Sequence, residues 1–274
     1  TSVNDAPAGT DTTVTTLEDT DYLFTAADFG FTDPDDAPAN ALQSVVITTL
    51  PALGTLSLAA GSSAPGPVLA GQEIALADIP FLTFTPAANQ HGLAQDSFTF
   101  QVRDDGGTLD GGTDLDASAN TVTFDVTSVN DAPSGADNTL TILESSVYSF
   151  AAADFGFTDP NDSPANTLQS VVITTLPGAG TLTLAAGSSA PGPVLAGQEI
   201  ALADIPFLQF APVTNANGMN YASFTFQVRD DGGTLDGGTD LDASANTLTF
   251  NVDPINSAPD GADNTVTTLE DTDY

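Results

Sequence analysis

The sequence predicts an all-β protein made of β-sandwich domains in tandem, and three observations support this prediction. Apolar and polar residues alternate over short runs, as in residues 97–102 (SFTFQV) and 121–126 (TVTFDV). Segments rich in Pro, Gly, Asp and Asn separate these runs. The same order of runs and turns then occurs a second time. Alternation with period two indicates strands with one buried face, and many short strands joined by turns are typical of immunoglobulin-like sandwiches.

The repeat has an offset of 126 residues. The heptapeptide TSVNDAP occupies residues 1–7 and again 127–133, and TLEDTDY occupies residues 16–22 and again the end of the chain. Such self-similarity usually builds length or multiplies a surface, and rarely builds one catalytic centre. We therefore expect the following organisation: a linker at residues 1–7, a first repeat at 8–129, a second repeat at 130–255 with its linker at 127–133, and the start of a third, truncated repeat at 256–274.

Other runs predict the remaining strands of the first repeat. Because they are β-branched or alternate in polarity, we expect strands at residues 12–17, 22–27, 42–49, 54–58 and 81–85. Helix is nearly absent from the pattern, and single helical turns are expected at most at residues 25–28 or 76–79.

The charge balance is strongly acidic, with 37 Asp and Glu against 2 Lys and Arg, and a net charge of −35. This charge disfavours nucleic acid and anionic membrane surfaces as partners, because both attract positive patches. Hydrophobic residues still make up 41% of the chain, enough for a core. There is no Cys, so no disulfide offsets the repulsion between the acids. No apolar run reaches the 18 residues that predict membrane insertion, and residues 1–20 do not read as a signal peptide.

The acids gather at predicted loops that the strand directions bring together. In a seven-stranded sandwich, the loop at residues 33–40 and the loop at 104–120 both lie at the end where the preceding linker enters. Glu18 follows the first strand at the opposite end, facing the next repeat. Two carboxylates about 4 Å apart repel by roughly 1 kcal/mol in water and about 4 kcal/mol at an effective dielectric near 20. A hard cation reverses this effect, and Ca²⁺ accepts flexible sets of about six to eight oxygen ligands.

These motifs resemble the calcium motifs of cadherin domains in the same order. They are residues 129–133 (VNDAP), 17–19 (LED), 33–35 (DPD) with Asn40, and 102–106 (VRDDG). Their particular form is similar to the cadherin-like, VNDAP-type tandem repeats of giant RTX adhesins that type I systems secrete in Gram-negative bacteria. The resemblance covers each whole repeat. It implies tandem immunoglobulin-like or cadherin-like β-sandwich domains that bind Ca²⁺ where repeats meet.

Carried over onto this chain, the resemblance makes Glu18 a ligand donated by the upper repeat and Asn130 and Asp131 linker ligands. The loops of the second repeat would add Asp159, Asn161, Asn166 and Asp230. Together with the acids of the long 104–120 loop and its copy, the candidate calcium ligands are Glu18, Asp33, Asp35, Asp36, Asn40, Asp104, Asp105, Asp110, Asp114, Asp116, Asn130, Asp131, Glu144, Asp159, Asn161, Asp162, Asn166, Asp230, Asp231, Asp236, Asp240, Asp242 and Asn256.

The chain departs from the cadherin pattern in ways that affect calcium stoichiometry. An acid-rich LDRE-type motif has no counterpart near residues 81–86, and Asn161 stands where the first repeat has Asp35. Ser257 stands where the preceding linker has Asp131. The loop at 104–120, which lies within a segment (residues 101–120) identical to residues 227–246, is either a further calcium site or a solvated acidic loop.

Other residues were weighed against simpler interpretations. His91 is the only histidine and is expected to be a turn residue before Gly92. Arg103 and Arg229 follow strands and are expected to form local ion pairs beside Asp104 and Asp230. Paired carboxylates leave a glycosidase formally open, but they lie in Gly- and Pro-rich loops and the chain has no Trp to stack on a sugar, so we expect no enzyme.

The predicted function is that of calcium-stiffened extender repeats in a large bacterial surface adhesin. They would project a distal adhesive domain from the cell surface, in cell adhesion and biofilm attachment, with Ca²⁺ and neighbouring repeats of the same chain as partners. The alternative is that the repeats themselves bind a ligand, which would be a polysaccharide, a cell-surface partner or another copy in a weak homophilic contact.

Overall fold

The computed structural model describes residues 3–256, 258–271 and 273. Contacts between Cα atoms divide the chain into two compact units. The first contains residues 1–132, 159–167 and 230–240, and the second contains 133–158, 168–229 and 241–274. Two predicted features, the substitution at Ser257 and the C-terminal Tyr274, lie outside the described residues, as do Thr1 and Ser2 of the first linker.

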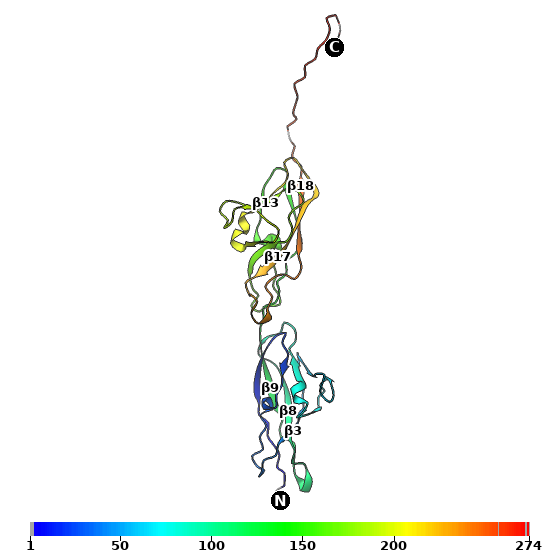
Figure 1. Ribbon diagram of the computed structural model, residues 1–274, viewed down its shortest axis with the longest axis vertical. Coiled ribbons are helices and arrows are strands. Elements are labelled where there is room, and N and C mark those ends of the chain that lie inside the picture. Colours follow the sequence, from blue (N-terminus) through cyan, green and yellow to red (C-terminus); the bar gives the residue numbers. More distant parts are fainter. Residues whose placement is uncertain (1–2, 257, 272, 274) are drawn as a thin grey trace. The chain divides into compact units, whose positions relative to one another are not determined.

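The first copy of the repeat forms a two-sheet sandwich (Figure 1). One sheet has five strands in the order β1-β9-β8-β3-β6, and the other has four in the order β2-β7-β4-β5. The bounds are β1 Thr12–Leu17, β2 Tyr22–Leu23, β3 Leu42–Ile47, β4 Thr55–Leu58, β5 Gly66–Pro67, β6 Glu73–Ala75, β7 Leu82–Thr85, β8 Gly92–Asp104 and β9 Asn120–Thr127.

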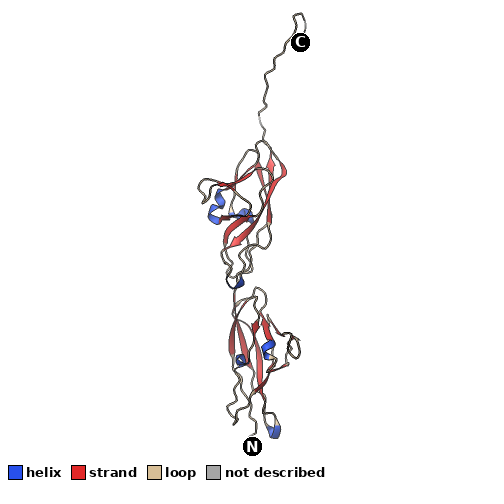
Figure 2. Cartoon of the chain, in the orientation of Figure 1, coloured by secondary structure: helices blue, strands red, loops and turns tan. Residues whose placement is uncertain are grey.

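The second copy repeats this arrangement with sheet orders β10-β18-β17-β12-β15 and β11-β16-β13-β14. Its strands are β10 Asn138–Leu143, β11 Tyr148–Ser149, β12 Leu168–Ile173, β13 Thr181–Leu184, β14 Gly192–Pro193, β15 Gln198–Ala201, β16 Leu208–Ala211, β17 Gly218–Asp230 and β18 Asn246–Asp253. The prediction of an all-β chain of immunoglobulin-like sandwiches is confirmed, and Figure 2 shows strands with only short helical segments between them.

The helical segments are all short 3₁₀ turns. They are η1 Ala26–Phe29, η2 Ile79–Phe81, η3 Leu109–Gly111, η4 Ala152–Phe155, η5 Leu202–Phe207 and η6 Leu235–Gly237. The residues described include no helix long and apolar enough to cross a membrane.

The predicted strand at residues 22–27 is wrong beyond Leu23. The chain turns instead into η1, because the carboxylate of Asp28 accepts the backbone N–H of Thr25 at 2.7 Å and stabilises the first turn. Gly30 ends that turn at φ 53°, in the left-handed region that glycine adopts without steric cost. The strand predicted at residues 97–102 is longer than expected, because β8 begins five residues earlier at Gly92, and the other predicted strands agree with the observed ones to within two residues at their ends.

Each core is built around phenylalanines on the inward positions of the strands. Phe84 of β7 stacks on Phe124 of β9 with ring centroids 3.6 Å apart, and Phe210 stacks on Phe250 at 3.8 Å in the second copy. All four rings are fully buried. Contacts across the two sheets of this kind stabilise a sandwich beyond the area they bury, by about 0.5–1.5 kcal/mol per aromatic pair.

Strand β1 runs parallel to β9, with Val14 opposite Phe124, whereas β8 runs antiparallel to β9. The segment before β1 and the loop before β9 therefore lie at the same end of the sandwich. This register brings the linker at residues 3–7 to the loop between β8 and β9, as the strand directions predicted.

One structural acid distinguishes the two copies. Asp96 of β8 is buried, and its carboxylate accepts the backbone N–H groups of Ala52, Leu53 and Gly54 at 2.7–3.0 Å. These groups form the turn between β3 and β4. The second copy has buried Ala222 at the equivalent position, so its corresponding turn has no such clamp.

We expect Asp96→Ala to destabilise the first sandwich by about 2 kcal/mol or more, because it leaves three amide donors without their charged acceptor. Asp96→Asn should cost less, since it keeps the shape and one acceptor oxygen. Chemical denaturation of both variants measures the difference. Equal stability of Asp96→Ala and the unaltered chain would show that the clamp contributes nothing.

Candidate cation site at the linker loops

The linker before the first sandwich is held by an asparagine between two loops. The Nδ2 of Asn4 donates to Asp104 Oδ1 at 3.0 Å and to the carbonyl of Thr113 at 2.8 Å. The Nδ2 of Asn40 donates to Asn4 Oδ1 in turn. Gly106 lies so close to these two amides that a Cβ at that position would overlap both. The linker therefore needs glycine there in order to seat its asparagine.

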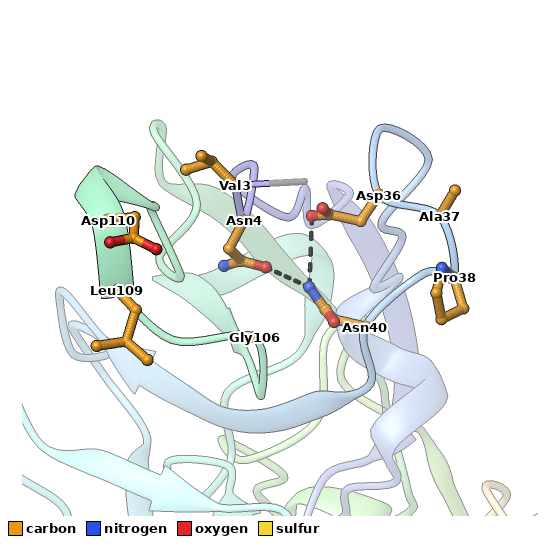
Figure 3. Close-up of a pocket in the computed structure, with 9 residues that line it drawn as sticks. All are labelled: Val3, Asn4, Asp36, Ala37, Pro38, Asn40, Gly106, Leu109 and Asp110. Carbon is orange, nitrogen blue, oxygen red and sulfur yellow. Dashed lines mark hydrogen bonds between the residues drawn. The ribbon is translucent and has the colours of Figure 1, made fainter. Parts of the chain in front are cut away.

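A pocket of about 480 Å³ opens beside Asn4. Figure 3 shows Leu109 and Asp110 of the β8–β9 loop on one side of it, Asp36 and Pro38 of the β2–β3 loop on the other, and Asn40 within reach of Asn4. Two predicted ligands, Asp36 and Asp110, thus line one cavity.

The linker at residues 128–132 repeats this arrangement within the first compact unit. The Nδ2 of Asn130 donates to Asp230 Oδ1 at 3.1 Å and to the carbonyl of Thr239 at 2.8 Å, and Asn166 donates to Asn130 Oδ1. The backbone N–H of Asp131 donates to Asp162 Oδ2 at 3.1 Å. The main hydrogen bonds of the linker asparagine therefore recur at both linkers.

Glu18 is completely buried just after β1, which is unusual for a carboxylate. Its Oε1 accepts the backbone N–H of Val129 at 2.7 Å, so it holds the start of the linker. Its Oε2 lies 3.2 Å from His91 Nδ1. Glu144 repeats this arrangement, because it accepts the N–H of Ile255 at 3.1 Å.

His91 was expected to be only a turn residue, and the structure places it in contact with this cluster. Its Nε2 also lies 3.3 Å from the carbonyl of Ser163. In the second copy Asn217 takes its place and donates to Glu144 Oε2 at 2.8 Å. One sequence feature could have indicated this contact. His91 and Asn217 occupy equivalent positions in the two copies, and both side chains carry an N–H donor.

Buried carboxylate oxygens without a hydrogen-bond partner are the main electrostatic feature of these loops. Among the described residues, five acids have one such oxygen each: Asp33 Oδ1, Asp104 Oδ2, Asp131 Oδ2, Asp159 Oδ1 and Asp230 Oδ2. Asp104 and Asp230 are fully buried. A buried anionic oxygen without a partner is costly, and such groups normally pair with a cation or a metal.

The pKa values of these carboxyl groups also reflect the cost of burying their charge. Burial raises the pKa of Asp104, Asp131 and Asp230 above the usual value for Asp. For Asp131, the charges of Asp19 and Glu18 add to the effect of burial. Burial, with the nearby charge of Asp159, raises the pKa of Asp162 to about 6.

Several predicted ligands have other structural roles. Asp116 is buried and accepts the N–H of Gly9 at 2.8 Å and the Nδ2 of Asn120 at 2.7 Å, which ties the chain before β1 to the start of β9. Asp242 does the same with Gly135 and Asn246 in the second copy.

One further pair of equivalent acids anchors loops. Asp105 accepts the N–H of Ala41 at 2.8 Å, and Asp231 accepts the N–H of Thr167 at 2.7 Å. Backbone and side-chain hydrogen bonds from Thr167 lower the pKa of Asp231. These carboxylates connect the β2–β3 and β8–β9 loops, or their copies, so they shape the site.

The arginines were expected to pair beside Asp104 and Asp230. Arg103 forms such a local pair with Asp114 of the β8–β9 loop at 2.6 Å and also pairs with Glu73 at 3.1 Å, and Arg229 pairs with Glu199 at 3.0 Å.

The remaining candidates differ in how far they are exposed to solvent. Asp35, Asn161, Asp236 and Asn256 are exposed. Asp240 is half-buried, and its backbone carbonyl accepts the N–H of Asp230 at 3.0 Å. No group of three or more His, Cys, Asp or Glu side chains in the described part of the chain is arranged to hold a metal ion. Calcium also binds amide and backbone carbonyl oxygens.

A second kind of surface feature lies away from the acids. Each copy has an apolar groove beside its shortest strands, of about 220 Å³ at Leu50, Leu56 and Val68 and about 290 Å³ at Leu176 and Leu182. The residues that line these grooves are aliphatic, proline, glycine and threonine, so neither groove offers an aromatic ring for a sugar.

Comparisons with known proteins support the fold. Residues 4–127 match the family model described as a bacterial Ig domain. No curated protein matches the chain at a meaningful level. The matched segment coincides with the first sandwich and includes the linker asparagine Asn4.

Solved structures with a similar fold include human mucin-like protocadherin EC1-2, at 17% identity and a TM-score of 0.37, covering 91% of this chain and 98% of that one. Drosophila N-cadherin EC1-4 has 10% identity and a TM-score of 0.37, covering 73% of this chain and 42% of that one. Mouse cadherin-23 EC22-24 has 11% identity and a TM-score of 0.35, covering 91% and 67%. Similarity at these scores carries no functional argument.

The raised pKa values predict how stability depends on pH when divalent cations are chelated. Unfolded Asp titrates near pH ~3.9, and folded Asp162 titrates at about 6. Between these values the folded chain binds more protons than the unfolded chain, so its free energy of unfolding falls as pH rises. We expect the melting temperature in chelator to be higher at about pH 5 than at about pH 7.

Asp162→Asn should reduce this dependence, whereas the same change at half-buried Asp36 is the control. The lowered pKa values of Asp78, Asp204 and Asp231 act below the usual range for Asp and leave this interval unaffected. Melting curves across the interval test the prediction. A melting temperature that rises steadily with pH would contradict it.

Proposed function

We propose that the chain consists of calcium-stiffened extender repeats of a large bacterial surface adhesin. The repeats project a distal adhesive domain from the surface of a Gram-negative cell in adhesion and biofilm attachment, and a type I system secretes the RTX-type parent. The domains follow the sequence repeat, with linkers at residues 1–7 and 127–133. The observation that carries the proposal is the set of buried, unpartnered carboxylate oxygens that surround both linkers.

The chemistry of the donors fits calcium. They are hard oxygens from carboxylates and asparagine amides on flexible loops, and Ca²⁺ tolerates such variable sets better than Mg²⁺, which requires a tight octahedron. The chain has no Cys and one His, so sites for softer metals lack their usual ligands. A divalent cation would also supply positive charge, which this strongly acidic chain has in only two Arg side chains.

At the linker of residues 127–133, Asp131, Asp159 and Asp230 are the central candidates, because each has an oxygen free to bind an ion. Glu18, Asn130 and Asp162 position the linker around them through their hydrogen bonds. When bound, the ion would replace repulsion with attraction and restrict the linker. That restriction is the mechanical function of an extender.

Asp33 and Asp104 are the corresponding candidates at the linker of residues 1–7. Asp36 and Asp110, on opposite sides of the pocket in Figure 3, extend the set of acids towards solvent. The repetition of one donor set at successive linkers suits a function in which every linker is stiffened in the same way.

Calcium should therefore raise the melting temperature steeply, and magnesium should raise it little. A ligand at 100 times its Kd adds about 2.7 kcal/mol to stability, which corresponds to a rise of roughly 10 °C for domains of this size. Scanning calorimetry in calcium, magnesium and excess chelator at equal ionic strength measures it. Superimposable melts in the three conditions would remove the basis for the proposal.

Asp131→Ala should distinguish a loss of calcium binding from a general loss of stability. In chelator we expect the variant to be as stable as the unaltered chain or slightly more stable, because an unpartnered buried oxygen is removed. In calcium it should gain less stability and show a broader range of linker conformations. Asp263→Ala, in the exposed C-terminal segment, removes the same charge and is the control.

Calorimetry with and without calcium, together with solution scattering, provides both readouts. A calcium response of Asp131→Ala equal to that of Asp263→Ala would exclude Asp131 as a ligand.

A further inference from the structure

We propose that Asn217 is a spontaneous deamidation site, which converts an amide donor on Glu144 into a second carboxylate beside it. Asn217 precedes Gly218, and this is the only Asn–Gly pair in the sequence. The first copy has His91 and Gly92 at the equivalent positions, so only the second copy has a side chain that can undergo this reaction.

The pair lies where the loop enters β17, and its surroundings are uncrowded on the side-chain side. Asn217 is exposed in the loop before β17, and Gly218 has φ +148°. No atom lies within 4 Å of the position that a Cβ on Gly218 would occupy. Gly218 begins β17 opposite Val252 of β18, and because it has no side chain, no Cβ hinders the approach of its peptide nitrogen to the Asn217 amide.

The reaction needs no co-reactant other than water. The peptide nitrogen of Gly218 loses its proton to solvent and attacks Cγ of Asn217, forming a five-membered succinimide. The bond from Cγ to Nδ2 breaks, and Nδ2 leaves as ammonia after taking up a proton. Water then adds to one of the two succinimide carbonyls and opens the ring, giving aspartate or isoaspartate at position 217.

Glu144 lies where it favours the departure of ammonia. Its Oε2 accepts a hydrogen bond from Nδ2 of Asn217 at 2.8 Å, so a carboxylate faces the nitrogen on which positive charge develops. Glu144 is only 5% exposed, and its Oε1 is held by the N–H of Ile255. The acceptor is therefore fixed in place.

The product changes the chemistry of this position. Before the reaction, the Nδ2 of Asn217 donates a hydrogen bond to the buried carboxylate of Glu144. Afterwards, two carboxylates face each other and the donor is gone. In the absence of a cation they repel, and a divalent cation between them would gain an additional ligand. The modification thereby makes this end of the second sandwich more dependent on calcium with age. This consequence rests on the proposed calcium function, whereas the modification itself does not.

The first experiment follows the modification in the full chain. The protein is incubated in warm, mildly alkaline buffer, and peptide mass spectrometry locates any gain of one dalton. We expect the gain at position 217, with isoaspartate among the products, and little at Asn215, which precedes Ala216. The variant Asn217→Gln should show no gain there. Absence of a gain at 217 in the folded chain, while the urea-unfolded chain gains it, would overturn the proposal.

The second experiment tests the consequence with defined variants. Asn217→Asp represents the aspartate product, and Asn217→Gln and Asn217→His keep an N–H donor. In chelator, Asn217→Asp should melt several degrees below Asn217→Gln. Calcium should then raise its melting temperature by more than that of either control. An equal calcium shift in all three variants would overturn the regulatory part of the proposal.

The two proposals fail in distinguishable ways. If calcium changes the melting temperature of no variant while position 217 still gains one dalton, the calcium function is wrong and the modification stands. If calcium stabilises every variant and position 217 stays unmodified, the deamidation proposal is wrong and the calcium function stands.

Discussion

Unpaired negative charge buried at the linkers is the constraint on which the rest of this structure depends. The chain carries 37 acids and two arginines, of which Arg103 pairs with Asp114 and Glu73 and Arg229 pairs with Glu199. Asp104 and Asp230 are nonetheless completely buried. A buried carboxylate is stable only if neighbouring groups offset the loss of its hydration. Hydrogen bonds from asparagine side chains and backbone N–H groups do so in part.

The sandwiches provide a rigid frame for that charge. Stacked phenylalanines such as Phe84 and Phe124 hold the two sheets together, and the parallel pairing of β1 with β9 sets the ends at which loops and linker meet. Many acids stabilise turns and chain crossings by accepting hydrogen bonds from backbone N–H groups. Asp96 and Asp116 each accept more than one such bond. The acidic composition is therefore divided between carboxylates that organise turns and carboxylates whose oxygens remain unsatisfied.

The two copies differ at few positions, and these differences have physical consequences. Ala222 replaces the turn clamp of Asp96, and Asn217 replaces His91 beside a buried glutamate. Both changes alter polar contacts at the periphery and leave the phenylalanine core intact. Tandem copies of one sandwich can thus retain a common fold while their turns and linkers acquire different stability and chemistry.

The sequence by itself determined the fold class, most strands and the convergence of the acidic loops on the linkers, because strand alternation and strand direction are local properties. It also predicted Asn130, Asp131 and Glu18 as a group, which the first compact unit brings together. Only the tertiary structure showed that Asp116 and Asp242 are saturated by hydrogen bonds, that Asp114 pairs with Arg103, and that His91 contacts Glu18. The reason is that a carboxylate in a loop motif looks the same in sequence whether its oxygens meet amides, a guanidinium or nothing. For Glu18 and Asp116 that difference depends partly on residues far away along the chain, which are His91 and Gly9.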